Sequence, residues 1–182
     1  MKKNTQPLSK HILIVDGYNV INAWDELKKL SAAENLEAAR DELNSMISEY
    51  ASFAGVNAQI VYDAYLVKDK ARIYKTYKNL EIIFTAEDET ADSYIEKLIT
   101  RLGKKRFLEF TVATDDIPVQ QIILGSGGSR ISTMQLGALL KINRSKIQKT
   151  IKNNNISTGY NIMDVLDEKS GQKLEKLRKN QK

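Results

Sequence analysis

Short runs of apolar residues alternate with longer amphipathic stretches over the first 140 residues of the chain. The first run, Ile12 to Val15, contains no polar position, which is the pattern of a strand buried on both faces of a parallel sheet. Similar runs cover residues 58–62 and 80–84, and a less regular one covers 108–113. The stretches between them carry apolar residues at helical spacing. We therefore predict an α/β fold with a central parallel sheet.

Local signals predict where two of the longer helices begin. Ser31 and Glu34 have the spacing of a capping box, which predicts a helix that Gly55 ends. Ser132 and Gln135 have the same spacing and predict a second helix, which continues to about residue 155. Both helices would pack an apolar side against the sheet.

Acidic residues follow every one of the four predicted strands. They are Asp16 after the first strand, Asp63 after the second, Glu89 and Asp92 after the third, and Asp115 and Asp116 after the fourth. The carboxyl ends of parallel strands lie at one edge of the sheet, where open α/β folds bind their ligands. Asn19 is close enough to Asp16 to share such a site. A single aspartate could merely cap the helix that follows it, but four placements in succession favour a common site.

The residue types at this edge indicate which cofactor it would take. Several carboxylates held close together repel one another unless a cation is present, and oxygen ligands suit Mg²⁺ or Mn²⁺. Zinc is not expected, because the chain has no cysteine and its only histidine is His11. The same composition excludes disulfides, cysteine nucleophiles and any mechanism that needs two imidazoles. Metal-assisted cleavage of a phosphodiester remains compatible with these residues.

Positive charge is concentrated at the end of the chain. Residues 1–140 carry 17 Lys and Arg against 19 Asp and Glu, whereas residues 141–182 carry 11 against 4. An acidic or neutral body with a basic end suits a protein that binds a polyanion, although a solvated lysine-rich tail gives the same pattern. Basic residues are also interleaved with tyrosines over 65–79, where no strand is predicted. Such a segment can hold phosphates and stack bases. The alternative interpretation is an ordinary surface loop. The candidate RNA-contacting residues are Lys68, Lys70, Arg72, Lys75, Lys78, Arg130, Lys141 and Arg144.

Four short motifs, taken in order, resemble those of the NYN domain, which belongs to the PIN-like nuclease superfamily. They are Asp16-Gly-Tyr-Asn19, Tyr62-Asp63-Ala64, Glu89-Thr-Ala-Asp92 and Ala113-Thr-Asp-Asp116. The resemblance covers about residues 11–150 and is greatest to the bacterial YacP-like group, which includes ribosome-associated endoribonucleases that act on mRNA. It implies a three-layer α/β/α sandwich with a central parallel sheet.

The resemblance also implies a role for each acidic residue. Asp16, Asp92 and Asp116 would be the core metal-binding carboxylates, with Asn19 supporting the site and Asp63 and Glu89 auxiliary. The family usually has Thr-Ser-Asp after the fourth strand, where this chain has Thr114-Asp115-Asp116. Asp116 is aligned with the family aspartate, and the additional Asp115 leaves open which of the two side chains points inward.

The domain organisation expected from this reading has three parts: an N-terminal extension (1–10), the nuclease domain (11–155) and a basic helical tail (156–182). No apolar run is long enough to span a membrane, and the first residues lack the apolar core of a signal peptide. We expect a cytoplasmic protein, with a monomer favoured.

Two functions are compatible with these residues and with what the resemblance implies about mRNA and the ribosome. The first is a metal-dependent endoribonuclease that cleaves mRNA and takes part in mRNA decay in association with the ribosome. The second is an RNA- or ribosome-binding module whose acidic site has lost its activity. A small-molecule phosphatase of the haloacid-dehalogenase type is disfavoured, because Tyr18 stands where its first strand would place a second aspartate. The completeness of the acidic set favours the nuclease.

Overall fold

All four strands predicted from the sequence are present, and they form a single sheet with two further strands. The structure is a computed structural model that describes residues 11–32, 35–63, 73–105 and 107–157, with backbone alone for 73–75 and 150–157. The strands are β1 (His11–Asp16), β2 (Asn57–Tyr62), β3 (Ile73–Tyr77), β4 (Leu80–Phe84), β5 (Glu109–Ala113) and β6 (Ser129–Ile131). Their order across the sheet is β3-β4-β2-β1-β5-β6.

The sheet is parallel except at one edge. β1 pairs in parallel with β2 and β5, and the parallel pairing continues outward to β4 and β6. β3 pairs antiparallel with β4. This edge strand was not predicted, because its residues lie within the segment that we interpreted by its basic and aromatic side chains.

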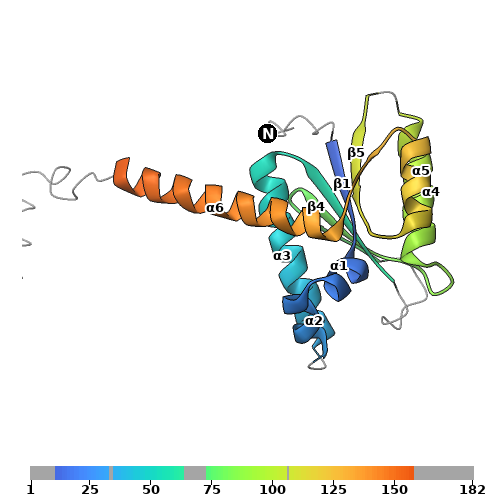
Figure 1. Cartoon of the computed structure of the whole chain (residues 1–182), viewed down its shortest axis with the longest axis horizontal. Coiled ribbons are helices and arrows are strands. Elements are labelled where there is room, and N and C mark those ends of the chain that lie inside the picture. The colour runs from blue at the N-terminus through green and yellow to red at the C-terminus, as the bar shows by residue number, and fades with distance from the viewer. Residues whose placement is uncertain (1–10, 33–34, 64–72, 106, 158–182) are drawn as a thin grey trace, which may run out of the picture. The chain divides into compact units, whose positions relative to one another are not determined.

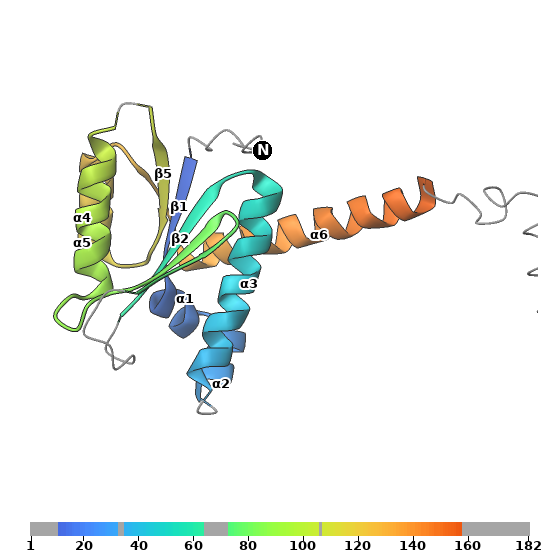
Figure 2. The same cartoon turned by 180° about the vertical axis from the view of Figure 1, so that it is seen from behind.

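Helices cover both faces of the sheet, as the α/β prediction requires. They are α1 (Gly17–Ala23), α2 (Asp25–Ala32), α3 (Leu36–Ala54), α4 (Ala91–Gly103), α5 (Ile117–Gly125) and α6 (Thr133–Ser157). On one face, α1, α2, α3 and the first turns of α6 pack against alternate strand residues such as Leu13 and Val15. On the other face, α4 and α5 pack against Ile14 and its neighbours. Figures 1 and 2 show α3 and α4 on opposite sides of the strands.

The pairing register places the carboxyl ends of the strands at one edge. Asp16 pairs with Val61, Tyr62 pairs with Phe84, and Val15 pairs with Ala113. In Figure 1, α1 starts at this edge, directly below β1. The segments that follow β1, β2, β4 and β5 therefore all leave the sheet on the same side, which is the arrangement that the acidic residues require.

The two capping predictions have different outcomes. At α6, the Ser132 backbone N–H donates to Gln135 Oε1 at 2.8 Å and the Gln135 N–H donates to Ser132 Oγ at 3.1 Å, which confirms that capping box. At α3, the cap is Asn35, whose Oδ1 accepts from the Ala38 N–H. Ser31 instead lies in the last turn of α2, so the prediction for Ser31 was wrong. Gly55 ends α3 in the left-handed conformation, as expected.

The chain divides into two units, Met1–Arg144 and Ser145–Lys182. The sheet and helices α1 to α5 lie in the first unit. The domain boundaries inferred from the sequence, after residues 10 and 155, stay a prediction. None of the helices in the described part of the chain has the length and apolar character needed to cross a membrane.

Candidate functional site

Four aspartates lie at the carboxyl edge of the sheet. Asp16 is the last residue of β1 and is only 7% exposed. Asp63 directly follows β2, and Asp92 lies in the first turn of α4, which follows β4. Asp116 follows β5 and precedes α5. The four residues come from four separate segments, and the parallel register of the sheet brings those segments together.

Helix N-termini hold three of these carboxylates in place. Asp16 Oδ1 accepts from the Asn19 backbone N–H at 3.1 Å, and Asp116 Oδ1 accepts from the Val119 N–H at 3.1 Å. Asp63 Oδ1 accepts from the Ala91 N–H at 2.7 Å, at the start of α4. The positive ends of α1, α4 and α5 therefore all face this edge and partly offset the negative charge. Each of these bonds engages only one oxygen of its carboxylate.

The carboxylates are close enough to change one another's acidity. Burial raises the pKa of Asp16 to about 6, against the opposing effect of the Asn19 N–H. The negative charges of Asp92, Asp63 and Asp116 also contribute to this rise. The pKa of Asp92 is raised by partial burial and then by the charges of Asp116, Asp63 and Glu96. The aspartates that the sequence predicted to converge therefore form one electrostatically coupled group.

This group fits a hard divalent cation by the chemistry of its donors. All four side chains offer carboxylate oxygens, the ligands that Mg²⁺ and Mn²⁺ prefer, and their mutual repulsion is what a cation would relieve. Within the described ranges, no three acidic or histidine side chains lie close enough together to coordinate one metal ion as they stand. The oxygens would have to draw together around a cation, with the helix caps as fixed points.

The structure separates the two neighbouring aspartates after β5. Asp115 turns toward β6 and the start of α6: its Oδ1 accepts from Arg130 Nη2 at 3.2 Å, and its Oδ2 accepts from the Thr133 hydroxyl. Asp116 turns toward Asp16 and Asp92, whose pKa values its charge raises. The Asp116 backbone N–H donates to Thr114 Oγ1 at 3.0 Å, which fixes this turn.

Asn19 and Glu89, which the resemblance gave supporting and auxiliary roles, occupy different positions. The Asn19 backbone orients the Asp16 carboxylate, as described above. Glu89 belongs to the turn before α4, and its Oε1 accepts from Lys97 Nζ at 3.1 Å. The charges that raise the pKa of Asp16 are those of Asp92, Asp63 and Asp116. Those that raise the pKa of Asp92 are those of Asp116, Asp63 and Glu96. Glu89 does line, with Asp63 and Tyr18, an open cavity of about 670 Å³ at this edge, a volume within the usual range of ligand-binding pockets.

Only part of the candidate RNA-contacting set can be placed. Lys68, Lys70 and Arg72 lie outside the described residues, and the backbone of Lys75 lies on β3 opposite Ile82. Lys78 is exposed in the turn that precedes β4, at the edge where the parallel strands begin and therefore away from the aspartates. Arg130 is near them but is engaged by Asp115. Lys141 and Arg144 are exposed on α6.

Arg40 and Tyr18 lie at this edge, and neither was predicted from the sequence to be a site residue. Arg40 on α3 donates through Nη1 to the Tyr18 hydroxyl at 3.1 Å, and its guanidinium lies 5.6 Å from the centre of the Phe84 ring. Tyr18 also packs edge-on against Tyr62, with ring centres 5.1 Å apart. These contacts place a cation beside the acidic edge. No local motif marks Arg40, because it reaches Tyr18 only through the packing of α3 on the sheet.

Comparison with known proteins identifies the family to which this chain belongs. Residues 13–179 match the model of the family described as the YacP-like NYN domain. The chain is 40% identical over 141 residues to YacP of Bacillus subtilis (strain 168), which covers 78% of this chain and 81% of that protein.

Two solved structures are similar to this one. The crystal structure of Rae1 (YacP) from Bacillus subtilis superposes with a TM-score of 0.69 at 36% identity, over 92% of this chain and 94% of that one. A single-site variant of the same protein gives a TM-score of 0.67 at 36% identity, over 79% and 82% of the two chains. Sequence and fold thus lead to one conclusion: the chain belongs to the YacP-like NYN domain family.

Proposed function

We propose that this protein is a divalent-metal-dependent endoribonuclease that cleaves mRNA in association with the ribosome. The NYN domain is a nuclease-type domain, so family membership supports an RNA-related function. The observation that carries the proposal is the coupling of Asp16, Asp63, Asp92 and Asp116 at the carboxyl edge of the sheet. The protein would act in the cytoplasm as a monomer.

In this proposal the four aspartates have different roles, which follow from their surroundings. Asp16, Asp92 and Asp116 would hold Mg²⁺ or Mn²⁺, and Asp63 would lend charge from its position at the start of α4. A bound divalent cation activates water and stabilises the charge of the reacting phosphate. Asp16 is the most buried of the set, and the helix caps hold its carboxylate and that of Asp116 in fixed orientations. Such preorganisation is what a hydrolytic site needs.

The substrate would be held by cations outside the acidic group. Lys141 and Arg144 are exposed on α6, and the chain from residue 141 onward carries a large excess of positive charge. RNA phosphates are the natural partners of such a surface, and each contact should steepen the salt dependence of binding. The ribosome enters the proposal through the YacP-like group that the motifs resemble.

The test of this function is cleavage of labelled mRNA by the full chain. We expect cuts in Mg²⁺ or Mn²⁺ and none in EDTA. The ends should be 5′-phosphate and 3′-hydroxyl, because water attacks the phosphorus and the 3′ oxygen leaves with a proton. Each reaction is run with and without translating ribosomes, and cutting that requires them supports the association. If RNA or ribosomes bind but no condition gives metal-dependent cuts, the protein is a binding module and the nuclease proposal is wrong.

Replacing each of the two adjacent aspartates separately should distinguish their roles. Asp116→Asn is expected to lower the cleavage rate at least a hundredfold, roughly 3 kcal/mol in barrier height, because Asp116 faces Asp16 and Asp92. Asp115→Asn should keep most of the rate but lower the melting temperature, since it weakens the contacts to Arg130 and Thr133. Rates and thermal melts of both variants check this. The reverse pattern would exchange the assignments of Asp115 and Asp116.

A further inference from the structure

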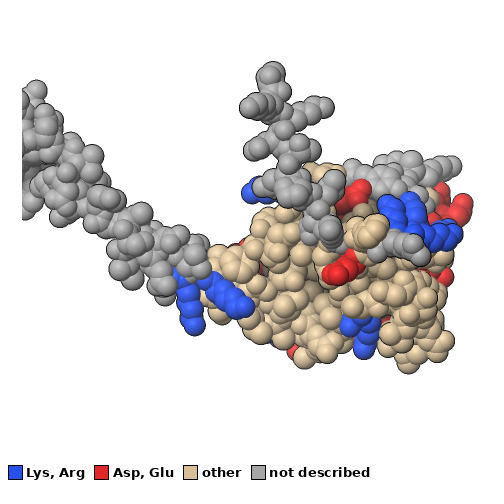
Figure 3. All heavy atoms as spheres, turned by 90° about the horizontal axis from the view of Figure 1, so that it is seen from above, with Lys and Arg blue, Asp and Glu red and all other residues tan. Residues whose placement is uncertain are grey.

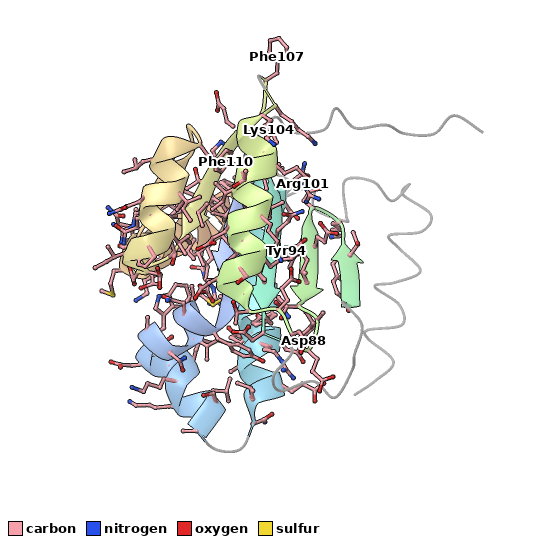
Figure 4. All side chains as sticks on the ribbon, turned by 90° about the vertical axis from the view of Figure 1, so that its right-hand side faces the viewer. Asp88, Tyr94, Arg101, Lys104, Phe107 and Phe110 are labelled. Carbon is pink, nitrogen blue, oxygen red and sulfur yellow. The ribbon has the colours of Figure 1, made fainter. Side chains whose placement is uncertain are left out.

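A second chemically distinct surface lies at the far end of α4 from the aspartates. Phe107 is 83% exposed, the highest value among the exposed large apolar side chains of the described residues. Arg101, Lys104 and Lys105 are also exposed there. We call these four residues the α4 corner. Figure 4 shows Phe107 and Lys104 beyond one end of α4 and Asp88 near the other.

The α4 corner is remote from the acidic site and is joined to it by helix α4. Asp92 lies in the first turn of α4 and Lys104 directly follows the last, so about 18 Å of helix separates them. Backbone bonds from Lys105 N–H to Leu102 O at 2.8 Å and from Leu108 N–H to Lys105 O at 3.2 Å hold the chain as it leaves the helix. Figure 3 views the molecule from this side and shows Lys and Arg side chains gathered at its right-hand end.

The side chains of the α4 corner have no evident structural role. Among the residues that the structure describes, Arg101, Lys104 and Lys105 form no salt bridge. Phe110, three positions after Phe107, is 3% exposed and packs closely against Gly128, so the core of this region is filled without Phe107. An exposed aromatic ring, with three exposed cations on the preceding residues of the same corner, is therefore available for a ligand.

The chemistry of the corner favours single-stranded RNA as that ligand. Every base offers a face that stacks on an aromatic ring, and the adjacent phosphates pair with Lys and Arg. A membrane surface is disfavoured, because stable interfacial binding uses a long amphipathic apolar face, whereas α4 buries its apolar residues against the sheet.

We propose that the α4 corner is a second RNA-contacting surface, on which a base stacks against Phe107 while Arg101, Lys104 and Lys105 hold neighbouring phosphates. It would anchor a segment of RNA some 18 Å from the acidic site along α4. The inference rests on the proposed action on RNA, but it concerns binding and can be measured with cleavage switched off.

The test is the affinity of the full chain for a fluorescently labelled single-stranded RNA in EDTA. Phe107→Ala should weaken binding about tenfold, as the loss of one stacked base does. Phe53→Ala is the matched control, since Phe53 is 46% exposed on α3, and its affinity should match the wild type. Replacing Lys104 and Lys105 by Gln should reduce the salt slope by about 1.4, because each phosphate that a lysine no longer neutralises lowers it by about 0.7. The corresponding change at Lys28 and Lys29 on α2 should leave the slope unaltered.

The binding and cleavage measurements have the following decisive outcomes. A Phe107→Ala protein that binds RNA like the wild type, or a wild type that does not bind RNA at all, overturns the proposal. So does binding to phosphatidylcholine–phosphatidylserine vesicles that depends on Phe107 while RNA binding does not. Metal-dependent cleavage is measured separately: cleavage without a Phe107 effect on binding overturns this surface alone. A Phe107 effect on binding without cleavage overturns the nuclease alone.

Discussion

Asp16→Asn is expected to make the metal-free protein more stable, by about 3 kcal/mol in the free energy of unfolding at pH 8. Burial and three neighbouring carboxylates raise the pKa of Asp16 from 3.8 to about 6, and every tenfold weakening of an acid corresponds to about 1.4 kcal/mol. Asparagine removes the buried charge and keeps an oxygen that can accept the Asn19 N–H. A residue whose loss stabilises the fold is there for another reason, here the proposed cation site.

The gain should depend on pH in a defined direction. Because the pKa of Asp16 is higher in the folded than in the unfolded chain, the folded protein binds more protons between about pH 4 and 6. The contribution of Asp16 to stability is therefore fully present below pH 4 and is lost as the pH rises through 6. Asp16→Asn should match the wild type near pH 4 and exceed it progressively up to about pH 7.

Urea unfolding in EDTA at several pH values measures this effect. Asp25→Asn, at an exposed position in the first turn of α2, is the control and should change stability little across the range. Adding Mn²⁺ at pH 8 should stabilise the wild type and leave Asp16→Asn almost unchanged, because a ligand stabilises only the state that binds it. An Asp16→Asn protein less stable than the wild type at pH 8 would contradict this description of the site.

Gly17→Ala should produce the largest loss of stability of any single methyl addition near the site, about 3 kcal/mol. A Cβ at Gly17 would lie 2.8 Å from Cζ of Tyr62 and closer still to two further ring atoms. Tyr62 cannot move aside easily: it is fully buried, stacks on Phe84, and donates through its hydroxyl to Asn44 Oδ1 at 3.0 Å. Adding a methyl to such a packed position costs about 1–3 kcal/mol or somewhat more.

Gly17→Ala should also lower the rate of RNA cleavage. Gly17 follows Asp16 and begins α1, so relieving the overlap shifts the helix N-terminus that orients the Asp16 carboxylate. We expect the cleavage rate to fall about a hundredfold, the effect of a misplacement of roughly 1 Å. Gly125→Ala is the control, because nothing lies within 4 Å of a Cβ at that position. If Gly17→Ala unfolds at the same urea concentration as Gly125→Ala, the packing described here is wrong.

Sequence patterns predicted the part of the fold that the site depends on. An unbroken apolar run such as Ile12 to Val15 has few alternatives to a buried parallel strand. Once the strands are parallel, residues that follow them must share one edge. That Asp16, Asp63 and the acidic segments after β4 and β5 lie at one edge follows from these two facts without any knowledge of tertiary contacts.

The parts that could not be predicted depend on contacts between distant segments. β3 is an edge strand whose sequence, Ile-Tyr-Lys-Thr-Tyr, suits an exposed loop as well as a half-buried strand, and only its pairing with β4 decides. The choice between Asp115 and Asp116 depends on Arg130 and Thr133, which arrive at the site on later elements. Ser31 has the spacing of a cap but lies inside α2, where its hydroxyl donates to the Lys28 carbonyl. In each case local spacing was compatible with two outcomes.

The central claim, that these aspartates form a metal-dependent site for cleaving RNA, is tested most directly by comparing cleavage rates of wild type, Asp16→Asn and Asp25→Asn on one mRNA. The reactions contain Mg²⁺ or Mn²⁺ and translating ribosomes, with EDTA as the blank. We expect Asp25→Asn to cut at the wild-type rate and Asp16→Asn to be slower by roughly a thousandfold or more, the equivalent of about 4 kcal/mol. Because Asp16→Asn is expected to be the more stable protein, unfolding would not explain the loss. Equal rates for wild type and Asp16→Asn would contradict the claim.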